Sequence, residues 1–394
     1  MLLSIAIILL LGILSNSLFS RLHIPALIGY LFIGLLLGPH LLDWIDPNLI
    51  ALSSDLRRIA LIIILTRAGL SLNIKELAKV GRPALLMTFV PATVEMVAAL
   101  ILGPSLLDLT ILQSLLVGSI LAAVSPAVIV PRMVHFIQVE RGTHKQIPQL
   151  ILAGASLDDV FVLVVFGALL SMAVSGRFSW MSLLALPVSI ISGIIAGYFI
   201  GSYLERGLRR LSLSKSFQIA LIITIALILL TLEDYSNGYF SGMLAIITIN
   251  ILLLRKNPEA AQSLSNTFNQ LWQVAEIFLF SLVGMSLNPT FIFQAGMKPV
   301  LFILLLSVIR LLFGVGLCLI NSPYTKKERF FIMVSYLPKA TVQAAIGAIP
   351  LSLGIDGGEL MLALAGLSIL ITAPIGAFAI DFLGPQLLDE QGKL

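Results

Sequence analysis

The amino-acid sequence predicts an all-α polytopic membrane protein. Hydrophobic residues make up 58% of the 394 positions and charged residues only 11%, and the mean hydropathy is +1.06. Apolar runs of about twenty residues, the length that a helix needs to cross the hydrocarbon core of a bilayer, recur along the whole chain. These observations exclude a soluble globular protein and place the chain among integral membrane proteins.

Thirteen apolar runs, bounded by proline, glycine and charged clusters, predict thirteen transmembrane helices. The first run, "LLSIAIILLLGILSNSLF", has no basic residue ahead of it and no small-residue cleavage site behind it, so we expect a retained helix and not a signal peptide. The predicted ranges are 2–19, 24–42, 55–70, 83–102, 111–137, 148–175, 181–203, 215–233, 239–254, 268–287, 297–320, 327–352 and 359–383.

The distribution of basic residues predicts the orientation of these helices. Seventeen Lys and Arg residues fall on the side of the odd-numbered connections and the C-terminal tail, and four fall on the side of the even-numbered connections. The positive-inside rule then places the C-terminus in the cytoplasm and the N-terminus outside. Because the net charge of +4 is spread over the loops, we expect a lipid bilayer and no nucleic acid as partner. The loops leave no room for a soluble nucleotide-binding domain.

The single cysteine, Cys318, lies inside an apolar run. With a single cysteine the chain cannot form an intramolecular disulfide, and we do not expect a metal cluster held by cysteine and histidine. We expect no cofactor.

Two matching phrases predict an internal duplication. "AGLSLN" at 68–73 matches "VGMSLN" at 283–288, and the same offset of 215 residues links Glu95 to Arg310. The alternative is an accidental match between segments of similar composition. Because seven spans precede the second copy, it would enter the membrane from the opposite side, and inverted repeats of this kind are typical of secondary transporters. The predicted parts are a first repeat at 1–175, a linker helix at 176–214 and a second, inverted repeat at 215–384.

Prolines predict two discontinuous helices at equivalent places in the repeats. Pro126 and Pro131 in "VSPAVIVPRM" would leave the carbonyls of Ala122 and Ala127 without helical partners, and Pro338 in "LPKATVQAAIG" would do the same for Val334. Such a backbone is tolerated only inside protein or beside a water-filled cavity. Ordinary proline kinks are the alternative interpretation. The polar residues expected at these crossing helices are Ser125, Lys339, Thr341 and Gln343.

Two adjacent carboxylates, Asp158 and Asp159, interrupt the apolar run at 151–170. An ionised side chain at mid-membrane costs roughly 2.5–3.5 kcal/mol on insertion scales, so such residues usually line a transport pathway. Neighbours in a helix differ by about 100° around its axis, so the two acids point in different directions. A carboxylate can hold a hard cation or a proton but not both, which predicts cation/proton exchange. A buried structural pair is the alternative.

Glu95, Arg310 and Arg67 are further charged residues within predicted spans. Glu95 and Arg310 occupy equivalent places in the repeats, and we expect them to form an ion pair. Arg67 lies close enough to a span end to extend to the membrane interface. The glycines at 193, 197 and 201 are expected to allow close helix packing.

The phrases "SLDDV", "AVSPAVIVP" and "LPKATVQAAIG" together resemble the cation:proton antiporters, most closely the paired-aspartate NHA-type sodium/proton antiporters. The resemblance implies an NhaA-like antiporter fold. In that fold helices 3–6 and 10–13 form a core domain, the remaining helices form a dimerisation domain of a homodimer, and the core moves like an elevator. It also implies that Asp159 is the principal cation and proton carrier and Asp158 its partner. By the same resemblance Ser125 supplies an oxygen ligand and Lys339 balances the crossing point.

The predicted function is therefore exchange of Na+ or Li+ for H+ across the cell membrane. Electrogenic relatives carry lysine where Arg310 stands, and if Glu95 holds Arg310 both aspartates are freed from a cationic partner, so we expect electroneutral exchange. A K+/H+ antiporter and a passive cation channel or membrane sensor remain alternatives. An intramembrane aspartyl protease needs carboxylates converging from different helices, so no enzymatic activity is expected.

Overall fold

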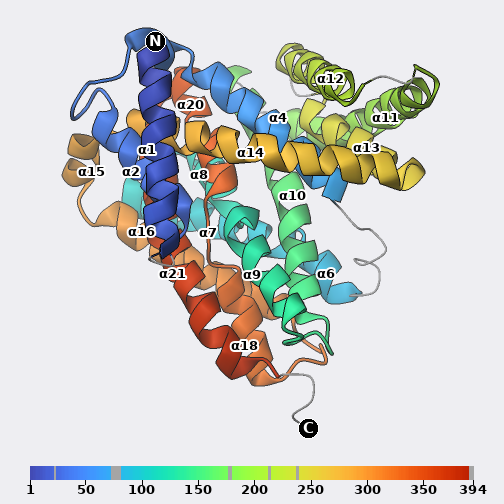
Figure 1. The fold of residues 1–394 in the computed structure, drawn as a ribbon. Helices are drawn as coiled ribbons and strands as arrows, with labels where there is room; N and C mark the ends of the chain where they lie inside the picture. The colour runs from blue at the N-terminus through green and yellow to red at the C-terminus, as the bar shows by residue number, and fades with distance from the viewer. Residues whose placement is uncertain (22–23, 72–80, 176–179, 212–213, 237–238, 390–394) are drawn as a thin grey trace. The chain divides into compact units, whose positions relative to one another are not determined.

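The computed structural model describes residues 1–21, 24–71, 81–175, 180–211, 214–236 and 239–389. Within these ranges the regular structure is helical (Figure 1). Four basic residues that contributed to the predicted orientation, Lys75, Lys79, Arg177 and Lys393, lie outside the described residues, as do positions 72 and 73 of the first repeat phrase.

Helices occupy each of the thirteen predicted ranges. Nine ranges hold one helix each: α1 (Leu2–Arg21), α2 (Ala26–Leu37), α4 (Ser53–Ser71), α10 (Ile147–Ser175), α11 (Trp180–Leu211), α12 (Lys215–Tyr235), α13 (Gly242–Lys256), α14 (Pro258–Ser286) and α21 (Gly358–Leu387). The other four ranges hold interrupted helices: α6 (Arg82–Met87) with α7 (Val90–Leu107); α8 (Ile111–Ala122) with α9 (Pro126–Gln138); α16 (Lys298–Ile309) with η1 (Arg310–Val315) and α17 (Gly316–Cys318); and α18 (Lys326–Ser335) with α19 (Thr341–Ile346) and α20 (Ile349–Ser352). Among the described residues, two short helices were not predicted, α3 (Pro47–Ala51) and α15 (Pro289–Ala295).

The chain is a polytopic membrane protein. In the described ranges, eight helical stretches are long and apolar enough to cross a bilayer, or nine if α14 and α15, which meet at a 60° bend, form one span. Two apolar stretches are shorter than a full span, namely α2 and the segment at 341–352. Length and composition alone therefore establish fewer spans than the thirteen we predicted.

The helices form two compact units. The first comprises Met1–Ser53, Asn73–Val162 and Phe280–Leu394, and the second comprises Ser54–Leu72 and Leu163–Leu279. All the predicted site residues belong to the first unit.

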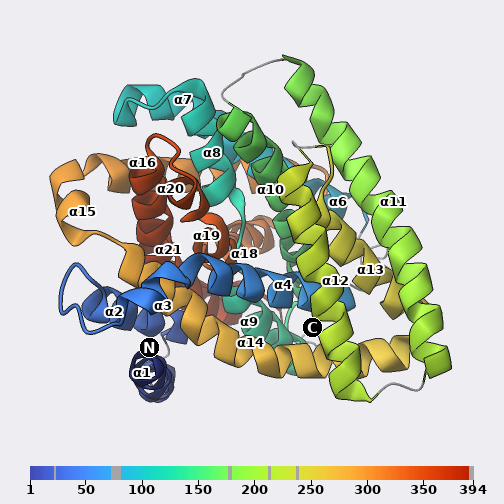
Figure 2. The same cartoon turned by 90° about the horizontal axis from the view of Figure 1, so that it is seen from above.

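In the second unit, α11 packs along α13 through its glycines (Figure 2). A Cβ on Gly197 would lie 2.6 Å from the Cβ of Thr248 and 2.7 Å from the carbonyl oxygen of Ala245. Gly193 and Gly201 make similar close approaches to α13. The predicted packing role of these glycines is confirmed.

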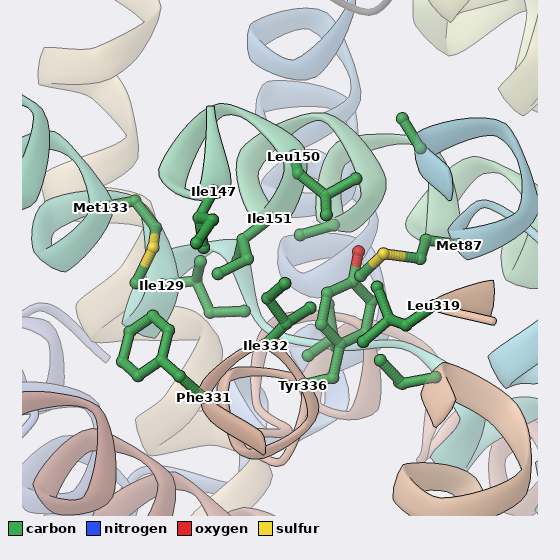
Figure 3. Packing of buried hydrophobic residues seen from close by; sticks show 14 of the residues in the cluster. Met87, Ile129, Met133, Ile147, Leu150, Ile151, Leu319, Phe331, Ile332 and Tyr336 are labelled. Carbon is green, nitrogen blue, oxygen red and sulfur yellow. The ribbon is translucent and has the colours of Figure 1, made fainter. Parts of the chain in front are cut away.

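The first unit is built around an apolar cluster between α10 and α18 (Figure 3). Further side chains of the cluster come from α6, α9 and α17, and from Leu319, which follows α17. The side chains come from helices far apart in the sequence and are almost completely buried. We call it the α10–α18 cluster; its labelled members are Met87, Ile129, Met133, Ile147, Leu150, Ile151, Leu319, Phe331, Ile332 and Tyr336. This cluster adjoins the two interrupted helices that form the candidate site.

Candidate functional site

The first helix break lies at residues 123–125, between α8 and α9. Ala123 and Ser125 have extended backbone angles, and Pro126 is the first residue of α9. Proline suits that position because its missing N–H would have no helical partner there. The break therefore precedes Pro126. Pro131 lies inside α9 and does not end the helix.

The second break lies at residues 336–340, between α18 and α19. The helix ends before Pro338, as expected from the steric restriction that proline places on the preceding residue. The carbonyl of Val334 is not free, contrary to our prediction. It accepts a hydrogen bond of 3.1 Å from the N–H of Leu337, in a tighter turn that closes α18.

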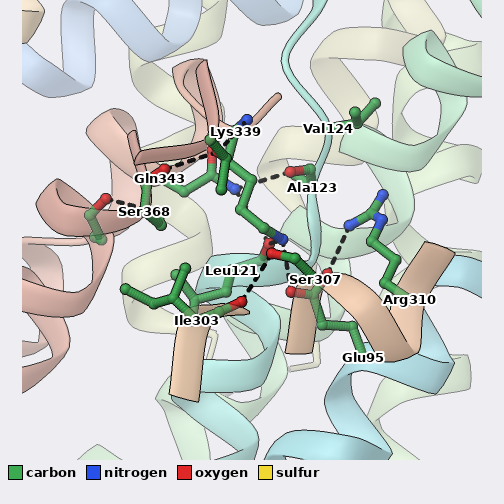
Figure 4. A network of polar contacts seen from close by, with 12 residues as sticks. Glu95, Leu121, Ala123, Val124, Ile303, Ser307, Arg310, Lys339, Gln343 and Ser368 are labelled. Atoms are coloured by element: carbon green, nitrogen blue, oxygen red, sulfur yellow. Dashed lines mark hydrogen bonds and ion pairs between the residues drawn. The ribbon is translucent and has the colours of Figure 1, made fainter. Parts of the chain in front are cut away.

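The two breaks contact each other directly. The N–H of Ser125 donates to the carbonyl of Pro338 at 2.8 Å. The Gln343 side-chain amide donates to the carbonyl of Ala123 at 2.9 Å and more weakly to that of Leu121 at 3.4 Å (Figure 4). Backbone groups that the helices leave unpaired are thus satisfied across the crossing.

Lys339 joins the second break to α8 and α7. Its side chain is 1% exposed, and its Nζ donates to the carbonyl of Leu121 and forms an ion pair of 2.6 Å with Glu95 Oε1. Its backbone N–H donates to Thr372 Oγ1 on α21 at 2.9 Å. Lys339 is therefore a fixed cation at the C-terminal end of α8, where the helix dipole favours positive charge.

Arg310 bridges two carboxylates. Its Nη1 lies 2.8 Å from Glu95 Oε2, so the predicted contact between these two residues is confirmed. Its Nη2 lies 2.8 Å from Asp158 Oδ2, which we did not predict. The expectation that both aspartates are free of a cationic partner was therefore wrong. Arg310 is the first residue of the π-helical segment η1, and such segments occur frequently at functional sites.

Asp158 and Asp159 have different surroundings. Asp158 is fully buried, and its Oδ2 also accepts a hydrogen bond of 3.0 Å from the N–H of Val124 in the first break. Asp159 is 8% exposed, and its buried Oδ1 has no hydrogen-bond partner among the described residues. The structure thus fixes Asp158 against Arg310 and the first break, and leaves an Asp159 oxygen available.

Other buried oxygens near the breaks also lack partners in the described part of the chain. Each is a side-chain oxygen of a residue predicted for the site: Asp158 Oδ1, Ser125 Oγ, Thr341 Oγ1 and Gln343 Oε1. Buried polar atoms normally have hydrogen-bond partners. Oxygen atoms are the ligands that hard cations prefer, so each of these atoms is chemically able to bind a cation or a water molecule.

The positive and negative charges of the buried ionisable groups at the site do not balance. Three are acids, Glu95, Asp158 and Asp159, and two are bases, Arg310 and Lys339. With all five ionised the group carries one net negative charge. Buried charge is costly unless it is paired, and either one monovalent cation or one proton would neutralise the excess.

Comparison with known proteins identifies the family. Residues 5–384 match the family model described as "Sodium/hydrogen exchanger, transmembrane". The chain belongs to the sodium/hydrogen exchanger family. It is 30% identical to sodium/hydrogen exchanger 9B2 of Mus musculus over 381 residues, which cover 93% of this chain and 69% of that protein. Identity to sodium/hydrogen exchanger 9B2 of Homo sapiens is 31% over 392 residues, covering 93% and 70%.

The fold of this exchanger is similar to that of a solved antiporter. The sodium proton antiporter MjNhaP1 from Methanocaldococcus jannaschii superposes with a TM-score of 0.82 over 97% of each chain, at 20% sequence identity. At that identity the comparison establishes the fold alone. The family match and this fold together place the chain among the helical membrane proteins of the cation:proton antiporter superfamily.

Sequence reasoning missed two side chains of the exchanger's site region. Thr372 on α21 accepts the hydrogen bond from the Lys339 N–H. Its one signal in the sequence is that a polar residue stands within the apolar phrase "SILITAPIG". Tyr336 stands next to the second break, with its ring centroid 6.0 Å from the guanidinium carbon of Arg310. An aromatic residue at a helix end gives no sequence signal for such a contact.

Proposed function

We propose that this exchanger is a secondary active antiporter that moves Na+ or Li+ against H+ by alternating access. The observation that carries this proposal is the contrast between the two aspartates. Asp158 is held through its Oδ2 by Arg310 and the first break, whereas Asp159 makes no ion pair among the described residues and has a buried oxygen without a partner there. Asp159 is the residue at which cation and proton compete.

Competition follows from the charge of the buried group. A deprotonated Asp159 leaves one excess negative charge, which a monovalent cation neutralises with help from oxygens such as Ser125 Oγ. Protonation of Asp159 removes the same charge and the same ligand, so the cation leaves. A carrier neutralised in either way crosses the membrane barrier more easily than a charged one, because burying an unpaired charge costs several kcal/mol.

This arrangement favours electroneutral exchange. A single exchanging carboxylate gives one proton for one monovalent cation. Arg310 stays protonated at any physiological pH, so it contributes no proton to the cycle. Lys339 is held in an ion pair with Glu95, which keeps its charge in place. One aspartate without a cationic partner among the described residues, and not two as expected from the sequence, therefore favours electroneutral exchange.

The finer architecture belongs to the same proposal. We expect thirteen spans in two inverted repeats, 1–175 and 215–384, joined by the helix within 176–214, with helices 3–6 and 10–13 forming an elevator-like core and the rest a dimerisation domain of a homodimer. The contact of Glu95 with Arg310, at equivalent places in the repeats, supports the duplication. We place the protein in the cell membrane, N-terminus outside and C-terminus cytoplasmic, without enzymatic activity.

Flux in proteoliposomes tests the proposal. Purified protein is reconstituted with a pH dye inside, and external Na+, Li+ or K+ is added at several pH values. We expect saturable proton efflux with Na+ and Li+. In the pH range where the proton outcompetes the cation, the apparent KM for the cation should rise about tenfold for each unit by which the pH is lowered. Asp159→Asn should abolish the flux, whereas Asp234→Asn, in an exposed ion pair with Arg58, should not.

The alternatives give different results. A response to K+ alone would make the protein a K+/H+ antiporter. Non-saturating cation flux without coupled proton movement would indicate a channel. A pH change driven by an imposed membrane potential, in the absence of ion gradients, would refute electroneutrality. Full activity of Asp159→Asn would show that the exchanging carboxylate lies elsewhere.

A further inference from the structure

Thr372 on α21 is a buried polar residue that contacts the second break. Its side chain is 1% exposed. The hydroxyl oxygen accepts a hydrogen bond of 2.9 Å from the backbone N–H of Lys339, and the hydroxyl donates one of 2.7 Å to the carbonyl of Ser368. Because the hydroxyl accepts and donates at the same time, its orientation is fixed.

Small side chains give α21 a face that fits the second break. Ser368, Thr372 and Gly376 follow one another at intervals of four residues, so they lie on one face of the helix. A Cβ built on Gly376 would lie 2.4 Å from Pro338 Cγ and 3.0 Å from the nitrogen of Pro338. The helix therefore approaches the break too closely for a larger residue at 376, and Thr372 stands one turn before that contact.

The Lys339 side chain is held at both of its ends. Its ammonium lies 2.6 Å from Glu95 Oε1 on α7 and donates to the carbonyl of Leu121 on α8 (Figure 4). Its backbone lies in the non-helical segment 337–340, where the N–H bonds to Thr372 instead of to a carbonyl of its own helix. The position of the ammonium therefore depends on the hydroxyl of Thr372.

Glu95 couples this contact to the aspartates. One of its oxygens pairs with Lys339, and the other lies 2.8 Å from Arg310 Nη1. Arg310 Nη2 lies 2.8 Å from Asp158 Oδ2. If the ammonium of Lys339 moves away, Arg310 must compensate both carboxylates. Asp158 then acts on Asp159 as a less compensated negative charge.

Several titratable side chains surround the two aspartates. Those that interact electrostatically with Asp158 or Asp159 come from α7, η1, α17 and the second break: Glu95, Arg310, Cys318, Tyr336 and Lys339. Of these, Lys339 is the residue bonded to Thr372. Weaker compensation of Asp158 makes a proton on Asp159 harder to displace, because a like charge nearby disfavours ionisation.

We propose that Thr372 is a positioning residue of the exchange reaction. Its hydroxyl holds the backbone of Lys339 so that the ammonium stays on Glu95 and Arg310 stays on Asp158. The proton on Asp159 then remains displaceable by the cation. All of these residues belong to the first unit. This inference rests on the proposed antiport function and adds to it a residue that sets the pH range of exchange.

Removal of the hydroxyl is the first test. Thr372→Val keeps the branched shape of the side chain, and in proteoliposomes we expect the pH of half-maximal Na+/H+ exchange to rise by about half to one unit. Thr372→Ser keeps the hydroxyl and should restore the wild-type pH profile. Ser368→Ala is the matched control, because its hydroxyl is similarly buried on the same helix and donates within it, to the carbonyl of Ala365. It should retain the wild-type profile.

Gly376→Ala perturbs the same contact in another way. The added methyl group meets Pro338 and pushes the second break away from α21, while the Thr372 hydroxyl is still present. We expect the pH profile to shift in the same direction. Gly366→Ala is the control on the same helix, because the atoms nearest to a Cβ there belong to the side chain of Leu287, 2.6 Å away. Its pH profile should match that of the wild type.

A Lys339→Gln background tests whether Thr372 acts through the ammonium. Thr372→Val should cause no further shift of the pH profile in this background, because no ammonium remains to be displaced. A shift as large as in the wild-type background would overturn the proposal, since the hydroxyl would then act by another path.

The remaining outcomes separate the two proposals. A merely structural role would lower the Tm of Thr372→Val and leave its pH profile and its apparent KM for Na+ unchanged. That result would overturn the positioning role while leaving antiport intact. If Thr372→Val does not fold, an unchanged pH profile in Gly376→Ala overturns it equally. Absence of any Na+- or Li+-driven proton flux in the wild type would instead refute the proposed function itself.

Discussion

The N–H of Ser125 donates a hydrogen bond to the carbonyl oxygen of Pro338 at 2.8 Å. This contact joins two helix breaks that are far apart in the chain. A backbone donor of the first break thus pairs with a backbone acceptor of the second. Asp158 extends the same arrangement by accepting a hydrogen bond from Val124 beside Ser125. The crossing and the acid-bearing helix α10 therefore form one hydrogen-bonded assembly.

The two functions of Ser125 can be separated. Ser125→Pro removes the donor N–H, and we expect the buried carbonyl of Pro338 to be left without its partner, lowering the unfolding free energy by about 1–3 kcal/mol. Ser125→Ala keeps the N–H and removes only Oγ. It should unfold at the wild-type temperature but require more Na+ for half-maximal exchange. Thermal unfolding in detergent and flux assays measure the two effects. A Ser125→Pro protein as stable as wild type would show that the backbone contact is dispensable.

Amide substitutions should affect the two aspartates in opposite ways. Asp158→Asn weakens the contact with Arg310, and since hydrogen bonds to charged groups are the stronger ones, we expect a loss of about 1–3 kcal/mol of stability. Asp159→Asn removes a buried charge without a cationic partner among the described residues, so stability should stay constant or increase. Melting temperatures of the purified proteins provide the comparison. Equal destabilisation by both substitutions would contradict the asymmetry that the structure shows.

Glu95 and Arg310 should behave as coupled partners. Removing one member of a buried ion pair costs up to about 3–5 kcal/mol because the other is stranded. Glu95→Gln removes the carboxylate charge that Arg310 and Lys339 both contact. Arg310→Gln leaves Glu95 with the ion pair to Lys339 alone. The double substitution should cost less than the sum of the single ones, with a coupling energy of at least about 1 kcal/mol. Unfolding of all four proteins under one condition measures the cycle. Additive effects would mean that the contact contributes nothing.

Glycine packing in the second unit gives a prediction that is independent of transport. Gly197→Ala forces a methyl group into Thr248 and the backbone of α13, and we expect a loss of about 1–3 kcal/mol. Gly207, on the same helix, has no atom within 4 Å of a built Cβ. Gly207→Ala should therefore be neutral or stabilising by up to about 1 kcal/mol through helix propensity. Thermal melts of the matched pair decide, and equal effects would refute the close packing of α11 on α13.

The features that depend on local pattern could be predicted from the sequence alone. Apolar runs predicted where helices lie, since hydrophobic length is a property of consecutive residues. Pro126 and Pro338 predicted the two breaks, because proline removes a donor wherever it stands. The offset between Glu95 and Arg310 predicted their contact, which the structure confirms.

The pairing of the polar groups depends on how the helices pack. The sequence could say that Asp158 and Asp159 differ by a rotation about the helix axis, but not which of them meets Arg310. That choice depends on the positions of α7, η1 and α10 and on the reach of one long side chain whose two terminal nitrogens donate to different carboxylates. The carbonyl of Val334 likewise found a partner in a turn that no sequence pattern specifies. A buried charge accepts whichever partner the packing brings within hydrogen-bond distance, so its pairing is settled only when the helices have packed.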